Sequence, residues 1–427
     1  AAVGCGDDDM GGVDAGGVDA RTGMDAPGTD APGMDAPGMD APGMDAPGVD
    51  AGGMDAGTDA AVASRLDSLL AMLRSGDLTS DGADAILQDV AWVEGWPLRD
   101  GDRFLFLTRW DGAAGSVSLV ADPNAFTPGD NPAETLATGV HYLVLWTLTG
   151  VEAIGAKYKW HATTGDVFRA PPESTAYDYD EFGEHGYIGP PTGRSYFERF
   201  PNLSAPGVDS RTMRVRVPAD FGGGVARTLL LHDGQNVFGP DAIFGGWAVE
   251  DALTGELADV LAVAIDNAPD RFDTYTHVPD SIGGGPIGGD ADEYLDLLED
   301  VALPFVRTRY AVRATGDSLM VMGSSLGGLV TLYHALTRPT VGCVGAMSST
   351  LGWGAFTGDG TQALVRRWTT RGPVSIYLDS GGNGACSDGD GDGVQEDSDD
   401  SDDFCVTNQL RDRLSDLGYE FGTDLSH

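Results

Sequence analysis

The sequence predicts an α/β fold, in which a doubly wound and mostly parallel sheet follows a small β-sandwich and a disordered N-terminal tether. Three observations predict it. Apolar strands alternate with helical stretches from residue 205 onward, short β-type runs occupy 97–197, and a five-residue repeat occupies 13–59. We therefore divide the chain into a tether (1–60), a helical segment (61–95), a sandwich (96–200) and an α/β domain (201–427).

The charge of the chain is large and unevenly distributed. The 427 residues include 67 acidic and 25 basic side chains, so the net charge is −42. This balance argues against nucleic acid or an anionic lipid surface as an electrostatic partner. Much of the excess comes from two segments, 6–60 with 13 Asp and 386–405 with eight Asp and one Glu. No run of 18 apolar residues occurs, so the sequence predicts no membrane-spanning helix.

The first residues resemble the end of a bacterial lipoprotein signal. Small residues precede Cys5, and Gly6 and the acidic run Asp7–Asp9 follow it. The resemblance implies that Cys5 is lipidated and that the protein is held outside the cytoplasm, at the outer membrane or cell surface of a bacterium. The alternative is an incidental cysteine in a terminus without structure.

The repeat that follows Cys5 is best seen at Met34–Gly38, which reads Met-Asp-Ala-Pro-Gly. It offers almost no large apolar side chain for burial, so it cannot offset the entropy cost of ordering the chain. Proline and mutually repelling aspartates keep such a chain extended. We therefore expect a tether that holds the folded part away from a membrane.

Between the tether and the α/β domain we expect two small units. Leucines at helical spacing in 62–94, interrupted by Gly76 and Asp77, predict a helical hairpin. The strands that follow are short and separated by Gly, Pro and Asp, which is typical of a β-sandwich. Val120–Phe126 resembles the strand and turn of early-set immunoglobulin-like domains.

The α/β domain contains five apolar strand candidates and four helix candidates. Their alternation implies βαβ units and a sheet covered on both faces. The expected strands are Met213–Val217, Thr228–His232, Val260–Ile265, Leu319–Met322 and Val374–Leu378, and the expected helices are 247–256, 290–307, 326–337 and 405–417.

A candidate nucleophile lies between one of these strands and the next helix. Gly323-x-Ser325-x-Gly327 follows an apolar strand and opens a helix, which is the context of a nucleophile elbow. Small residues allow the strained turn to pack, and Ser325 Oγ then stands exposed at the head of the helix. The backbone N–H of Leu326 can face a developing oxyanion, aided by the helix dipole.

Several blocks of this domain resemble, in order, the enterochelin-esterase and esterase-D type of α/β-hydrolases. They are Leu230–Asn236, Gly245–Leu253, Ile265–Thr276, Glu299–Tyr310 and Ala346–Ser349. The resemblance implies a serine carboxylesterase acting on a small-molecule, siderophore or glycan-borne ester. It also implies a second oxyanion N–H near Gln235, a triad in the chain order Ser, acid, His, and no metal or organic cofactor for the chemistry.

The triad acid and base are harder to place. Where the family carries its acid, this chain reads Gly381-Gly382-Asn383-Gly384, so the candidates are Asp379 at the strand end and Asp402 or Asp403 before the last helix. Asp379 and Asp403 each have an ordinary structural alternative, a local hydrogen bond and a helix cap respectively.

The histidines do not match the family's pattern. In the family, a further strand precedes the loop that carries the catalytic histidine, and His427 resembles a residue of that strand and not the catalytic histidine. His232 and His334 do not fit the chain order of the triad. We therefore expect the sequence to be a C-terminally truncated piece, and the chain as given to lack the catalytic histidine.

The acidic segment carries the spacing of a calcium loop, with oxygen ligands at positions 1, 3, 5, 7 and 12 and a glycine at position 6. The ligands would be the side chains of Asp388, Asp390, Asp392 and Asp399 and the carbonyl of Val394. The alternative is a solvated acidic loop. Cys386 and Cys405 bracket the loop, and a disulfide between them would stabilise the fold by about 3 kcal/mol.

Two other functions compete with the esterase. One is a catalytically silent lipoprotein that binds through the sandwich, and the other is an acyltransferase of the same fold.

Overall fold

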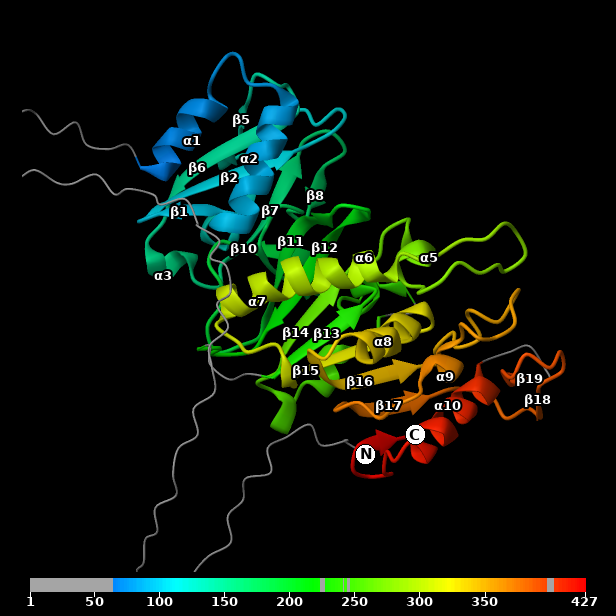
Figure 1. Cartoon of the computed structure of the whole chain (residues 1–427). Coiled ribbons are helices and arrows are strands. Elements are labelled where there is room, and N and C mark those ends of the chain that lie inside the picture. Colours follow the sequence, from blue (N-terminus) through cyan, green and yellow to red (C-terminus); the bar gives the residue numbers. More distant parts are fainter. Residues whose placement is uncertain (1–63, 223–226, 241, 244–245, 398–402) are drawn as a thin grey trace, which may run out of the picture. The chain divides into compact units, whose positions relative to one another are not determined.

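The computed structural model describes residues 64–222, 227–240, 242–243, 246–397 and 403–427 (Figure 1). The predictions for Cys5, for the repeat, for Asp399 and for Asp402 therefore lie outside the described residues. Within the described part of the chain, none of the helices combines the length and the apolarity needed to cross a bilayer.

Two short helices open the described chain, α1 (Arg65–Leu73) and α2 (Ser80–Val93). Ser64 and Thr79 cap them, because each hydroxyl accepts a hydrogen bond from an N–H of the first turn. Their leucines pack against Leu105 and other apolar residues of the neighbouring sheet. The predicted helical hairpin is confirmed.

Two sheets follow and face one another across an apolar core. One has the order β1-β2-β6-β5, and the other contains β7, β3 and β4. Phe104 and Phe106 of the first sheet meet Leu119 and Trp160 of the second in one buried cluster. The assignment of this unit as early-set immunoglobulin-like stays a prediction. Its elements are β1 (Leu98–Asp100), β2 (Arg103–Arg109), β3 (Val117–Ala121), β4 (Asn131–Pro132), β5 (Glu134–Thr135), β6 (His141–Thr147), α3 (Gly150–Ala153), β7 (Lys157–Ala162) and β8 (Val167–Arg169).

The second of these sheets continues into the α/β domain. The strand order is β20-β17-β16-β15-β13-β14-β12-β11-β9-β10-β7-β3-β4. The expected domain boundary between residues 200 and 201 falls inside β11, which pairs with β9 on one side and β12 on the other. The remaining strands of this sheet are β9 (Ala176–Asp180), β10 (Gly183–Tyr187), β11 (Tyr196–Ala205), β12 (Val208–Val217), β13 (Thr228–His232), β14 (Leu261–Ile265), β15 (Gly316–Ser324), β16 (Val341–Met347), β17 (Ser375–Asp379) and β20 (Leu425–Ser426). A separate antiparallel pair is formed by β18 (Cys386–Ser387) and β19 (Glu396–Asp397).

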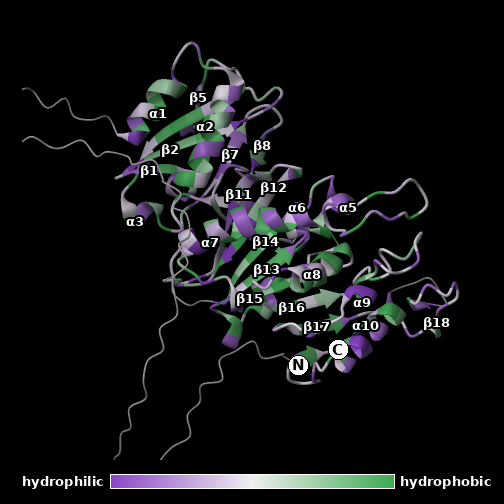
Figure 2. Ribbon diagram, viewed as in Figure 1, coloured by the Kyte–Doolittle hydropathy of each residue, from purple (hydrophilic) through white to green (hydrophobic). Residues whose placement is uncertain are grey.

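The neighbouring strands β14, β13, β15, β16, β17 and β20 are parallel, and β13 and β14 are buried along their whole length. In β13, Leu230 points into one core and its neighbours Leu229 and Leu231 into the other, and β14 and β15 alternate in the same way. Figure 2 shows β13 and β14 in the hydrophobic colour. The doubly wound α/β-hydrolase sheet is confirmed. Its helices are α4 (Val249–Ala252), α5 (Arg271–Thr274), α6 (Ala291–Asp296), a π-helical turn (Leu297–Ala302), α7 (Leu303–Tyr310), α8 (Leu326–Thr337), α9 (Leu364–Arg367) and α10 (Phe404–Asp416).

One predicted helix is shorter than expected. The stretch 247–256 forms only α4 and a separate 3-10 turn at Gly255–Leu257. Gly255 has a φ of +58°, outside the helical region, so the helix cannot run through it.

The parallel order fixes where a site can form. Parallel strands present their carboxyl ends at one edge of a sheet, and ligands of open α/β sheets bind outside that edge. The segments that follow β13, β15, β16 and β17 therefore gather there.

Candidate active site

Ser325 occupies a strained turn between β15 and α8. Its φ of 57° and ψ of −126° lie in a region that non-glycine residues rarely adopt. Its N–H donates to the carbonyl of Met347 (3.0 Å), which ties the turn to β16. A Cβ at position 323 would lie 2.4 Å from the carbonyl carbon of Gly327, so only glycine permits this crossing. The side chain of Ser325 is exposed, as the elbow pattern predicts.

The backbone N–H of Leu326 is the first of α8, a helix of 12 residues. The first N–H groups of a helix have no acceptor within the helix, and the helix dipole places partial positive charge there. The N–H groups of Gly328 and Leu329 donate to the carbonyl of Ser325 at 3.1 Å, which fixes the serine at the helix start.

The segment after β13 carries Gln235 and lies close to this turn. Asp233 begins it, and the Arg271 guanidinium binds the Asp233 carboxylate with two hydrogen bonds of 2.7 and 2.9 Å. Gln235 Oε1 accepts from the N–H of Asn267 (2.9 Å), so the segment is held on two sides. A Cβ at position 327 would lie 3.1 Å from Asp233 Oδ2, which shows that this segment and the start of α8 touch.

Asp379, the first candidate acid, ends β17 at the same edge. Its Oδ1 accepts from the N–H of Ser348 (3.2 Å) and its Oδ2 from the hydroxyl of Tyr377 (2.9 Å). Asp379 lies near His427, which directly follows β20: partial burial and the Arg411 guanidinium lower the pKa of His427, and Asp379 opposes them.

Asp403, the second candidate acid, precedes α10. Its side chain makes no capping bond to the helix, and its Oδ1 instead accepts from the N–H of Gly352 (3.3 Å). Asp403 therefore holds the segment after β16, which leads back to Ser325 through Thr350.

All seven histidines lie among the described residues, and no hydrogen bond joins any of them to Ser325 Oγ. His232 is buried and paired with the hydroxyl of Tyr294 (2.9 Å), and burial lowers its pKa to about 3. Burial likewise lowers the pKa of His277 to about 4. His334 is buried beside Glu299 (2.9 Å). These three rings are buried and hydrogen-bonded within the fold and make no hydrogen bond to Ser325. The sequence likewise excludes His232 and His334 as the catalytic histidine by their place in the chain order.

Two residues at this edge were not singled out from the sequence. Thr350 Oγ1 lies 3.3 Å from Ser325 Oγ, and the buried Asp280 holds the segment after Thr350. Thr350 directly follows a block that resembles the family, which is a signal that sequence reasoning could have used. Asp280 precedes a glycine-rich stretch and carries no such signal.

The described part of the acidic segment before α10, residues 386–397, brings three predicted ligands together. One carboxylate oxygen from each of Asp388, Asp390 and Asp392 lies within 4.8 Å of the others. Gly393, at position 6 of the loop, has a φ of +87° and its N–H donates to Asp388 Oδ2 (3.1 Å). The side chain of Val394 is buried.

The predicted disulfide between Cys386 and Cys405 is confirmed. It joins the start of the acidic loop to the first turn of α10.

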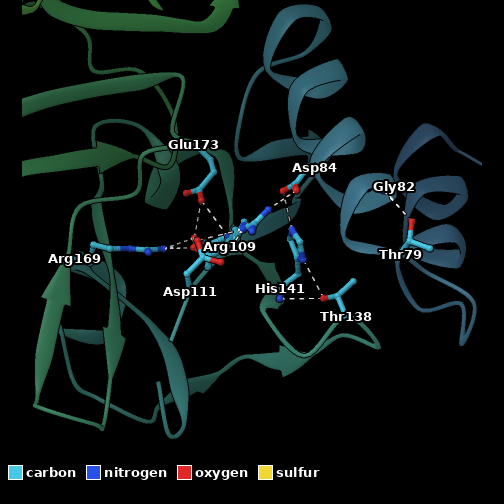
Figure 3. Close-up of polar contacts among 10 residues, drawn as sticks. Thr79, Gly82, Asp84, Arg109, Asp111, Thr138, His141, Arg169 and Glu173 are labelled. Atoms are coloured by element: carbon cyan, nitrogen blue, oxygen red, sulfur yellow. Dashed lines mark hydrogen bonds and ion pairs between the residues drawn. The ribbon is translucent and has the colours of Figure 1, made fainter. Parts of the chain in front are cut away.

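A second polar cluster lies in the sandwich, around a cavity of about 670 Å³ lined by residues of α2, β2 and the segments near 170 and 201 (Figure 3). There Arg109 pairs with Asp84 and Asp111, and His141 bridges Asp84 and Thr138. None of the residues that line this cavity belongs to the Ser325 edge.

Comparison with solved structures found matches of low sequence identity. An IroE-like serine hydrolase from Shewanella oneidensis is 17% identical, with a TM-score of 0.41, over 54% of this chain and 71% of that one. The enterobactin esterase FES from Shigella flexneri is 15% identical, with a TM-score of 0.40, over 76% of this chain and 86% of that one. The BES protein from Bacillus cereus is 13% identical, with a TM-score of 0.39, over 54% of this chain and 85% of that one.

No curated protein sequence matches the chain significantly. The comparison with family models is positive. Residues 208–391 match the family described as "Putative esterase", and the matched range runs from β12 through the Ser325 turn into the acidic loop. This range also holds the central strands of the sheet, so the part of the α/β domain that carries the Ser325 turn is similar to the esterase family, and the match supports an ester hydrolase of α/β-hydrolase fold.

Proposed function

We propose that the protein is a serine carboxylesterase with Ser325 as its nucleophile, acting on a small-molecule, siderophore or glycan-borne ester. The observation that supports this most strongly is the exposed serine held in a strained turn at the head of α8, at the carboxyl edge of the sheet. Backbone strain of this kind persists only where the surroundings enforce it, and here Gly323, Gly327 and the bond to Met347 do so.

In this proposal Ser325 Oγ attacks the ester carbonyl as a general base takes its proton. The negative charge that develops on the carbonyl oxygen faces the N–H of Leu326 and the segment at Gln235. The alcohol leaves with a proton, and water then hydrolyses the acyl–serine ester by the same route, which frees the acid. Asp379 is the favoured triad acid, because it ends β17 two strands from Ser325 and lies near the end of β20.

Hydrolysis of a chromogenic ester tests the proposal. The native protein should hydrolyse 4-nitrophenyl acetate well above the buffer rate, and Ser325→Ala should return the rate to the buffer level. Ser324→Ala is the matched control, since Ser324 belongs to the strand β15 and not to the turn. Activity that survives Ser325→Ala would refute the assignment.

We also propose that the acidic loop binds a structural Ca²⁺ ion. Three carboxylate oxygens already lie within 4.8 Å of one another, and hydrogen bonds from the N–H groups of Asp392, Gly393 and Val394 orient the three carboxylates. Carboxylate and carbonyl oxygens are the ligands that Ca²⁺ prefers. Bound there, the ion would offset the mutual repulsion of the aspartates and would take no part in the chemistry.

Finally, we propose that Cys5 carries the lipid of a bacterial lipoprotein and anchors the protein to a membrane. The support is the residue pattern around Cys5 and the five-residue repeat that follows it. In phase partition of the native protein, the wild type should enter the detergent phase and Cys5→Ser the aqueous phase. Equal partition of the two would refute the anchor.

A further inference from the structure

A loop after β16 reaches back and touches Ser325. We call residues 348–357 the Thr350 loop. The N–H of Thr350 donates to the carbonyl of Ser325 (3.2 Å), and the hydroxyl oxygens of the two residues lie 3.3 Å apart. Among the described residues, no other hydrogen bond involves Ser325 Oγ. The position of this loop therefore bears directly on the position of the serine oxygen.

Asp280 anchors the other end of the Thr350 loop. Its Oδ2 accepts from the N–H groups of Gly354 (2.7 Å) and Phe356 (3.1 Å), and its Oδ1 accepts from the hydroxyl of Thr357 (2.7 Å). The side chain is almost fully buried, with 3% exposed. Burial raises its pKa, but these hydrogen bonds and one from Ser281 outweigh it and hold the pKa below its ordinary value.

Asp280 is itself fixed in place. Its backbone forms an isolated antiparallel bridge with Ile287, through hydrogen bonds of 3.0 and 2.9 Å. Two residues earlier, the carbonyl of Val278 accepts from Trp353 Nε1 (2.7 Å), so the same stretch holds the loop at a second point. A carboxylate on a rigid support that binds several donors of a loop restricts the loop to one conformation.

We propose that Asp280 is a positioning residue for Ser325, acting through the Thr350 loop. The inference rests on the proposed role of Ser325. Asp403 also contacts the loop, but through one longer hydrogen bond to Gly352 (3.3 Å), whereas Asp280 receives three from it. Because a displacement of about 1 Å at a reacting atom can cost up to about 100-fold in rate, a loosened loop should slow the reaction at the serine.

The test is the rate of covalent labelling of the native protein by a fluorophosphonate, separated into the binding constant of the probe and the rate of bond formation. Asp280→Asn presents an amide N–H where the carboxylate accepts from two N–H groups. We expect bond formation to slow about tenfold and the binding constant to change little. A rate equal to that of the wild type would overturn the inference.

A double-mutant cycle separates positioning from general destabilisation. Thr350→Val removes the hydroxyl that meets Ser325. If Asp280 acts through Thr350, the double variant should label no more than about twofold slower than Asp280→Asn, because contacts in one network are not additive. If each single variant slows labelling about tenfold and the double variant slows it about 100-fold, the two residues act independently, and the inference is overturned.

Glu198→Gln is the matched control. Glu198 is also a buried carboxylate, with 6% exposed, but it accepts from Arg309 (3.0 Å) and Tyr310 (2.6 Å) and not from the loop. The Glu198→Gln variant should label like the wild type at temperatures where it is folded.

If Asp280→Asn does not fold, Thr357→Val is the second variant. It removes one of the three hydrogen bonds to Asp280 and should slow labelling about two- to threefold, and a wild-type rate would contradict the proposal. Labelling that persists in Ser325→Ala would instead refute the proposed function itself.

Discussion

Two polar clusters of this protein both contain Arg–Asp ion pairs, but they fix different parts of the fold in place. Around the cavity of the sandwich, Arg109 pairs with Asp84 and Asp111, and His141 joins Asp84 (Figure 3). At the Ser325 edge, Arg271 pairs with Asp233. The first cluster fastens α2 to β2 and β6. The second fixes the segment beside a strained and exposed serine.

This difference shows which feature marks a site. Charged networks occur in both places, so a network alone does not indicate catalysis. The strained backbone of Ser325 and the close approach of Gly323 to Gly327 are found at the Ser325 edge and not in the cluster around Arg109. The burial of the ion pairs differs as well, with side-chain exposures of 42% and 37% for Arg109 and Asp84 against 24% and 9% for Arg271 and Asp233.

The largest expected effect comes from breaking the buried pair. Arg271→Met leaves the Asp233 carboxylate buried without its cation, which typically costs about 3–5 kcal/mol. Because Asp233 begins the segment of Gln235, ester hydrolysis should also fall at temperatures where the variant is folded. Chemical unfolding and an esterase assay measure the two effects, and a variant with unchanged stability and activity would remove the distinction between the clusters.

Acid should destabilise the α/β domain through its buried histidines. Burial depresses the folded-state pKa of His232 to about 3 and of His277 to about 4, from an ordinary value of 6.5. Between these values the unfolded chain binds more protons than the folded chain, so stability falls as the pH falls from about 6.5 toward 4. His277→Gln should flatten this dependence in melting curves at pH 7.5, 6 and 5. Parallel curves for variant and wild type would show that His277 does not contribute.

Calcium should have a smaller effect. Modules of this kind outside the cell bind Ca²⁺ at roughly 10⁻⁴–10⁻³ M. At ten times the dissociation constant, the ion would raise stability by about 1.4 kcal/mol. EDTA should therefore lower the melting temperature, and Asp390→Ala should abolish the response to EDTA. Calorimetry that detects no uptake up to about 10 mM, well above that range, would leave a solvated acidic loop.

The smallest effect is expected in the sandwich. Arg109→Met breaks two partly exposed ion pairs, and such pairs contribute little to stability because solvent screens them. The melting temperature should change little and ester hydrolysis not at all. A loss of activity as large as that of Arg271→Met would show that the two clusters are not different in kind.

Much of the fold follows from local patterns in the sequence. The runs at Thr228–His232 and Leu326–Thr337 form β13 and α8 with the predicted bounds, because a run of apolar residues and a 3.6-residue period are local signals. The Ser325 turn is likewise encoded by neighbouring glycines. The helix predicted over 247–256 is shorter in the structure because Gly255 has a positive φ. The apolar period of the sequence does not indicate the φ of a single residue.

What the sequence could not supply are contacts between distant segments. Asp280 meets Gly354 across 74 positions, and Arg271 meets Asp233 across 38. The spacing of residues along the sequence does not indicate such a pair. The continuation of the sandwich sheet into the α/β sheet through β11 is a long-range pairing of the same kind.

The central claim is that Ser325 is the nucleophile, and peptide mapping after fluorophosphonate labelling of the native protein tests it most directly. Ser325 is exposed at the turn, whereas Ser324 ends β15. We predict a single adduct on Ser325, lost in Ser325→Ala and retained in Ser324→Ala. An adduct on any other residue, or an unlabelled Ser325 in a protein that hydrolyses esters, would contradict the account.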